Sequence, residues 1–166
     1  MSTDAIVLLK EDHKEMRRLF NEFSNAGENA KATKGKLVDK ILEALTVHTY
    51  IENECMYPEV RKLLPDLEDD VLESYEEHHV ADVLCMELVT MKPADERFDA
   101  KVTVLIENVT HHMEEEEQDW FPKVRAGLSR KQLQEMGARM IEMKKKAPRR
   151  PSQPSALKKT VDAILA

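Results

Sequence analysis

The chain has 166 residues, a formal net charge of -7, 42% hydrophobic residues and 34% charged residues. This length fits one domain with its own core, and this balance is typical of a soluble globular protein rather than a disordered or membrane one. The negative charge argues against a nucleic-acid partner, because phosphate binding needs a basic surface. No run resembles a membrane span or a secretory signal, and two cysteines make no disulfide scaffold, so we expect a cytoplasmic location.

The pattern of apolar residues predicts an all-α fold. Glycine is rare, and apolar residues recur at alternating steps of three and four, which places them on one face of a helix. Short connections favour an up-down four-helix bundle, and Pro58 should kink or loosen the end of its second helix. The four helices are expected at about residues 3–24, 31–64, 66–91 and 94–125.

The last part of the chain differs from the bundle. Ser129 and Gln132 have the spacing of a capping box, which predicts a fifth helix to about Lys146. A proline-rich, locally basic linker follows at 147–154. A last short amphipathic helix is expected from Ser155, docked on the bundle or on a partner, with apolar residues Leu157, Val161, Ile164 and Leu165. We therefore divide the chain into a bundle, residues 1–127, and a C-terminal helical extension, residues 128–166.

The six histidines fall at four places, one on each helix expected in the bundle. Two of them begin the same phrase, His-x-x-x-Glu at 48–52 and 112–116, and an aromatic-proline pair follows each. These phrases are 64 positions apart, and His13 and His78 are 65 positions apart. The chain therefore reads as a duplicated pair of helices, and a pseudo-two-fold packing would bring the chemistry of both halves together.

Helix geometry explains the His-x-x-x-Glu spacing. Residues four apart lie on the same face, and here they continue the apolar stripes, so they point inward. One such phrase arises readily by chance, and a lone inward histidine is usually a hydrogen-bonded core residue. Two phrases at matched offsets favour a metal site instead, because buried imidazoles and carboxylates need a cation or other partners. The expected metal ligands are His13, His48, Glu52, His78, His112 and Glu116.

The combined pattern resembles the hemerythrin-like family, also called the HHE cation-binding domain, over about residues 6–124. That resemblance implies an up-down bundle with two non-haem irons bridged by carboxylates and an oxo or hydroxo group. By position, the four histidines would be terminal ligands, and Glu52 and Glu116 the bridges. Manganese and zinc rank behind iron. The matching residues are Glu11-Asp12-His13, His48 and Glu52 with Tyr57-Pro58, Glu76-Glu77-His78, and His112 and Glu116 with Phe121-Pro122.

Several residues near this pattern leave alternatives open. Asp82 stands where the oxygen carriers of the family have a fifth histidine, so reversible oxygen carriage is not expected, and Asp82 is interpreted as solvated. His79 and His111 compete with their neighbours as ligands or lie outside the site. Tyr75 comes one turn before His78 and could bring a phenol near iron, although a core or rim position is the simpler interpretation.

The expected function is that of a non-haem di-iron protein that binds or reacts with O2, H2O2 or NO. Two classes remain open: an enzyme with catalase-like or nitric oxide peroxidase or reductase-like activity, and a non-catalytic sensor or binder of O2, NO or iron. The missing fifth histidine favours the enzyme slightly, because a more open site can admit peroxide. We expect a small-molecule ligand and neither nucleic acid nor membrane, and the sequence names no catalytic residue and no protein partner for the tail.

Overall fold

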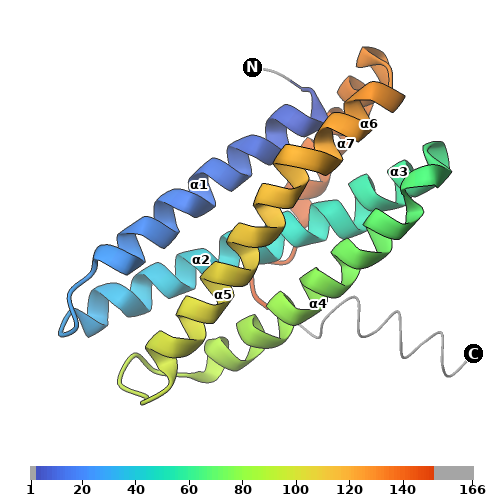
Figure 1. Cartoon of the computed structure of the whole chain (residues 1–166). Helices are drawn as coiled ribbons and strands as arrows, with labels where there is room; N and C mark the ends of the chain where they lie inside the picture. The colour runs from blue at the N-terminus through green and yellow to red at the C-terminus, as the bar shows by residue number, and fades with distance from the viewer. Residues whose placement is uncertain (1–2, 152–166) are drawn as a thin grey trace, which may run out of the picture.

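Four long helices form an antiparallel bundle (Figure 1). The computed structural model describes residues 3–151, and all regular structure in that part of the chain is helical. The expected all-α bundle with an added helix is confirmed, whereas the helix expected after Ser155 lies outside the described residues. The bundle helices are α1 (Ala5–Asn25), which pairs with α2 (Lys31–Ile51), and α4 (Glu68–Thr90), which pairs with α5 (Phe98–Glu115).

Both helices that carry a His-x-x-x-Glu phrase change their winding at the glutamate. A π-helical segment, η1 (Glu52–Met56), separates α2 from α3 (Tyr57–Leu63), and η3 (Glu116–Trp120) separates α5 from α6 (Phe121–Gly127). The loosened turns thus precede Pro58 and Pro122, which occupy the first turn of the next helix, where a missing N–H costs little. A short 3-10 turn, η2 (Pro65–Leu67), leads into α4.

Local capping fixes where the first and last described helices begin. The Asp4 carboxylate accepts hydrogen bonds from the backbone N–H groups of Ile6 and Val7, at 2.9 and 3.2 Å. The predicted capping box is present: Ser129 and Gln132 exchange hydrogen bonds of 2.8 and 3.2 Å between side chain and backbone. It opens α7 (Arg130–Lys146), which packs on α1, α2 and η1. The fourth helix begins at Phe98, because residues 94–97 form a turn.

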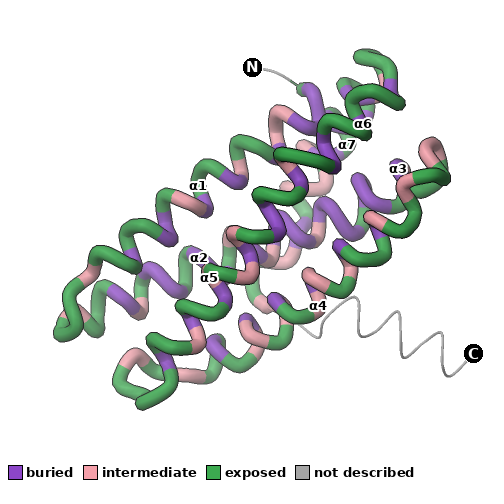
Figure 2. Tube along the Cα trace, in the orientation of Figure 1, coloured by how far each residue is buried: buried purple, intermediate pink, exposed green. Residues whose placement is uncertain are grey.

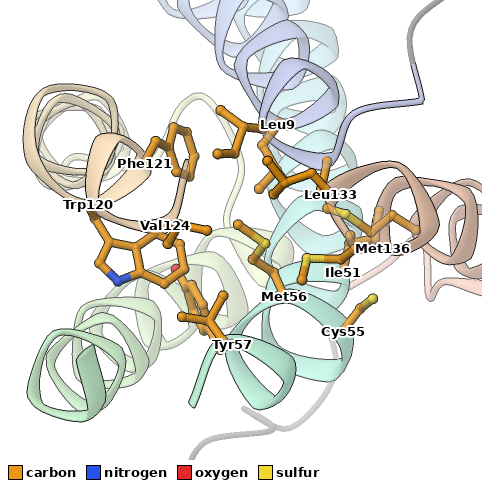
Figure 3. Packing of buried hydrophobic residues seen from close by; sticks show 14 of the residues in the cluster. Leu9, Ile51, Cys55, Met56, Tyr57, Trp120, Phe121, Val124, Leu133 and Met136 are labelled. Atoms are coloured by element: carbon orange, nitrogen blue, oxygen red, sulfur yellow. The ribbon is translucent and has the colours of Figure 1, made fainter. Parts of the chain in front are cut away.

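The interior holds two apolar clusters with a polar layer between them. The buried positions face inward along every helix (Figure 2). One cluster joins the start of α1 to η1, α3, α6 and α7, and Figure 3 shows Leu9, Met56, Phe121 and Leu133 meeting there. The other joins the far ends of α1, α2, α4 and α5. The histidines fall between these clusters along each helix. Among the described helices, none is long and apolar enough to cross a membrane.

Candidate metal centre

All six residues predicted as metal ligands meet in the polar layer. α1, α2, α4 and α5 each supply one histidine, and the two glutamates are the first residues of η1 and η3. None of the six is more than 6% exposed. Their side chains form two neighbouring groups of atoms, which we call site A and site B.

Site A consists of the Nε2 atoms of His13 and His48 with one oxygen from each glutamate. The distances are 3.2 Å from His48 Nε2 to Glu52 Oε1 and 3.3 Å from His13 Nε2 to Glu116 Oε2. These four atoms lie within 4.8 Å of one another. All four are buried and have no hydrogen-bond partner among the described residues. Burying four unpartnered polar atoms face to face is costly, and a cation held between them removes that cost.

Site B uses the other oxygen of each glutamate. Glu52 Oε2 lies 3.0 Å from His78 Nε2, and Glu116 Oε1 lies 3.3 Å from His112 Nε2. The two imidazole nitrogens are 3.0 Å apart. Each carboxylate therefore gives one oxygen to site A and one to site B, which is the arrangement of carboxylates that bridge two cations.

Site B also receives a phenol hydroxyl, from Tyr57. This hydroxyl donates to Glu116 Oε1 at 2.8 Å and to Glu52 Oε2 at 3.2 Å. It also lies 3.1 and 3.3 Å from the Nε2 atoms of His78 and His112. Site B thus offers five potential ligand atoms. For Tyr75, the sequence left a phenol near iron open but favoured a core or rim position. Tyr75 is half-buried, and its hydroxyl donates to the carbonyl oxygen of Asn53 at 3.3 Å.

The duplication explains why site A lacks a hydroxyl. Phe121 follows Tyr57 by 64 positions and packs in the equivalent place. Its ring stacks on His13 with centroids 5.7 Å apart, and the Tyr57 ring lies 5.2 Å from the His78 ring. Each site therefore has two imidazole nitrogens and one oxygen from each of the two carboxylates, and site B has a fifth potential ligand atom, the Tyr57 hydroxyl oxygen.

The outer nitrogen of each histidine, Nδ1, also has a partner. Such partners fix the ring orientation and tautomer and make imidazole a better metal ligand. Asp12 and Glu77 belong to the pattern that carries the family resemblance, but the contact of all four partners with the histidines was not predicted. The 64- and 65-position offsets pair them, Asp12 with Glu77 and Asn53 with Glu117. The pairs are His13 with Glu117 at 2.7 Å, His48 with Asp12 at 3.1 Å, His78 with Asn53 at 2.8 Å and His112 with Glu77 at 3.2 Å.

Comparison with known proteins identifies the family. The family model described as the hemerythrin HHE cation binding domain matches residues 4–124. The chain belongs to this family. A structure of a hemerythrin HHE cation binding domain-containing protein from Mycobacterium kansasii superposes with a TM-score of 0.72 at 22% identity, and 86% of each chain is covered. At that identity the likeness shows the fold alone.

A curated relative is longer. The HHE chain is 27% identical over 143 residues to a protein of Nostoc sp. named DNA nickase. The match covers 86% of this chain and 40% of that relative. The chain thus spans less than half of the protein whose name carries the nicking activity.

The charges of the HHE site favour a bound cation. Burial alone would lower the pKa of His48, but the carboxylates of Glu52 and Asp12 outweigh it and raise that pKa to about 10. Glu116 and Glu77 likewise raise the pKa of His112 against the effect of burial. Without a metal, the buried carboxylates thus hold protons on these imidazoles. A cation with two positive charges satisfies the same carboxylates.

The remaining sequence candidates lie outside sites A and B. Asp82 is half-buried rather than fully solvated, and burial raises the pKa of its carboxyl group. His79 is half-buried and His111 is exposed. Cys55 and Cys85 are buried free thiols away from the two groups of ligand atoms. The structure therefore brings His78 and His112, rather than their neighbours, to the centre of the HHE bundle.

Proposed function

We propose that this HHE protein holds two iron ions in sites A and B and that the pair binds or reacts with a small oxidant. The proposal is supported mainly by one observation: in each of the two buried glutamates, one carboxylate oxygen faces the imidazoles of site A and the other faces those of site B. Imidazole and carboxylate suit iron, manganese and zinc, whereas structural zinc prefers closed tetrahedral sets, often with thiolates. Iron in such a site supplies reversible one- and two-electron redox chemistry.

The two positions differ in how many ligand atoms the protein offers. His13, His48 and the two bridging carboxylates give site A four atoms, and the Tyr57 hydroxyl gives site B a fifth. An octahedral ion has six coordination positions. Site A therefore leaves more coordination positions open to an outside molecule than site B does.

The size of the space beside the site supports a small ligand. A cavity of about 10 Å³ adjoins His48, His78 and His112, and its walls include Met16 and Val109. That volume is at the lower limit for one water molecule, so without movement of its walls the space beside the site admits no large substrate.

Hydrogen peroxide decomposition is the activity we rank first. One peroxide loses two electrons and two protons to become O2, and a second gains them to become two waters, so no outside reductant is needed. In the metal-free protein, burial and the two glutamates raise the pKa of the Tyr57 hydroxyl well above its usual value. Without metal, the hydroxyl therefore keeps its proton and donates to Glu116 and Glu52. The alternative is a non-catalytic O2, NO or iron sensor built on the same ligands.

The test is metal content, optical spectrum and oxygen evolution from peroxide. We expect about two irons per chain, as the two sites of the proposal require, with near-ultraviolet bands that bleach on reduction by dithionite. Glu116→Gln should lose iron, whereas Glu114→Gln, at an exposed position two residues earlier, should keep it. Iron without oxygen evolution would favour the sensor, and a protein that takes up no iron would refute the proposal.

A further inference from the structure

An acidic groove leads from the surface to site B. It lies between α4 and the α5–η3 segment and has a volume of about 260 Å³. Its inner end is formed by the buried side chains of His112 and Glu116. The carboxylates along its walls come from Asp70, Glu73, Glu77, Glu115 and Asp119.

The groove keeps a negative charge after its ion pairs are counted. Lys123 lies 3.5 Å from Asp70 and 2.9 Å from Asp119 and so offsets one of the two negative charges at that end. Among the described residues, no Lys or Arg forms an ion pair with Glu73, Glu77 or Glu115 at the other end. That end attracts cations and repels anions.

Glu77 and Glu115 at this end of the groove form, with the neighbouring exposed His111, a cluster that could hold a metal. Ligand atoms of Glu77, His111 and Glu115 lie within 4.8 Å of one another. His111 and Glu115 are one turn apart on α5, with Nε2 and Oε1 3.0 Å apart, and Glu77 reaches across from α4. Glu77 also lies 3.2 Å from the Nδ1 atom of His112. A cation in this cluster would therefore be one residue away from a ligand of site B.

The buried indole of Trp120 is independent evidence that the groove accommodates water or another polar ligand. Trp120 lines the groove and is 4% exposed, yet its Nε1 has no hydrogen-bond partner within residues 3–151. Figure 3 shows this nitrogen on the side of the ring that faces away from the apolar cluster. A buried N–H without an acceptor is costly, and a groove that holds water or a hydrated ion supplies an oxygen acceptor.

In the first of the two related helix pairs, the surface equivalent to the groove is covered rather than open. Most residues 64 or 65 positions before the outer lining of the groove are apolar and buried: Ala5, Leu9, Ile51, Cys55 and Met56. α7 covers them through Leu133, Met136 and Met140. Leu8, the equivalent of Glu73, is apolar and half-buried, and Asp12, the equivalent of Glu77, keeps its acidic group. One of two related faces is thus sealed by a helix, and the other is acidic and open to solvent.

From these observations we propose that the groove is the route by which divalent cations, Fe2+ in particular, reach the metal centre, and that they dock first at Glu77, His111 and Glu115. The proposal rests on the proposed function only in requiring a metal centre at the inner end. An acidic cleft concentrates cations and speeds their association, most strongly at low ionic strength.

The first experiment measures how fast the metal-free protein takes up Co2+, followed by the absorption of the bound ion. We expect Glu73→Gln/Glu115→Gln to slow uptake about tenfold at low salt, with unchanged final occupancy, because two carboxylates leave the groove. The matched control is Glu107→Gln/Glu114→Gln, which removes the same charge from exposed positions of α5 outside the groove. Equal rates for both variants would overturn the proposal. A wild-type protein that takes up no metal would overturn the proposed function as well, so the two failures differ.

The second experiment tests the docking cluster at equilibrium. Mn2+ is titrated into the iron-loaded chain, and the free ion is followed by electron paramagnetic resonance. We expect one weak additional Mn2+ per chain that is lost in His111→Ala/Glu115→Gln and retained in Glu107→Gln/Glu114→Gln. An additional Mn2+ that survives the first substitution, or none in the wild type, would overturn the docking cluster.

Discussion

The hydroxyl of Tyr57 and its absence at Phe121 make the two metal positions unequal. In Tyr57→Phe, we expect iron to remain while any visible phenolate-to-iron absorption disappears, because the four other atoms of site B are unchanged. The metal-free variant should also lose about 1.5–3 kcal/mol, since the hydroxyl bonds to buried carboxylates. Optical spectra and denaturant unfolding check both outcomes. Phe121→Tyr is the complementary variant, and unchanged spectra in both would rule out a ligand role for the hydroxyl.

The protonation of His48 in the metal-free protein provides a second test of the metal site at the residue scale. The pKa of His48 is raised to about 10 in the metal-free protein, and a metal needs the neutral imidazole. Metal binding at neutral pH should therefore release protons, and the affinity should fall as the pH falls below about 10. Calorimetric titrations in buffers of different ionisation enthalpy measure the released protons. No buffer dependence would mean that His48 is already neutral.

At the scale of elements, α7 is held by a close backbone contact. A Cβ at Gly137 would lie 1.6 Å from the carbonyl oxygen of Thr3, so only glycine lets α7 approach the start of α1. Gly137→Ala should lower the melting temperature, because overpacking costs about 1–3 kcal/mol and exceeds the gain in helix propensity. Gly27→Ala is the control, since nothing lies within 4 Å of that position, and it should stabilise slightly. A stabilised Gly137→Ala variant would mean that α7 shifts at little cost.

The π-helical turns explain which part of the site could be predicted from sequence. The spacing of four between His48 and Glu52 holds on an α-helix, so the ligands could be predicted from the periodicity and the repeat. Tyr57 follows Glu52 by five residues, which on an α-helix is a rotation of about 140° away from it. The wider π-helical turn of η1 brings Tyr57 back to the same side of the helix as Glu52. The spacing of apolar residues does not predict this change from α-helix to π-helix. For this reason the sequence did not point to Tyr57 as a potential ligand, and the tyrosine it left open was Tyr75, at α-helical spacing from His78.

For the whole molecule, the placement of two apolar clusters on either side of the metal layer predicts how the fold responds to metal removal. Neither cluster contains any of the six expected metal ligands. A chelated protein should therefore retain its helical circular dichroism while its melting temperature falls, because binding to the folded state alone stabilises it. Loss of helicity at room temperature after chelation would show that the clusters cannot hold the bundle without metal.

Because the two related helix pairs belong to one chain, each pair can acquire substitutions that the other does not share. Two identical subunits around a true symmetry axis would have to present the same residue at equivalent places. Here the equivalent places hold Tyr57 and Phe121, and Asn53 and Glu117. A covalent link lets each half change its residues independently, so sites A and B of one chain can differ, whereas the equivalent sites of a homodimer would stay identical.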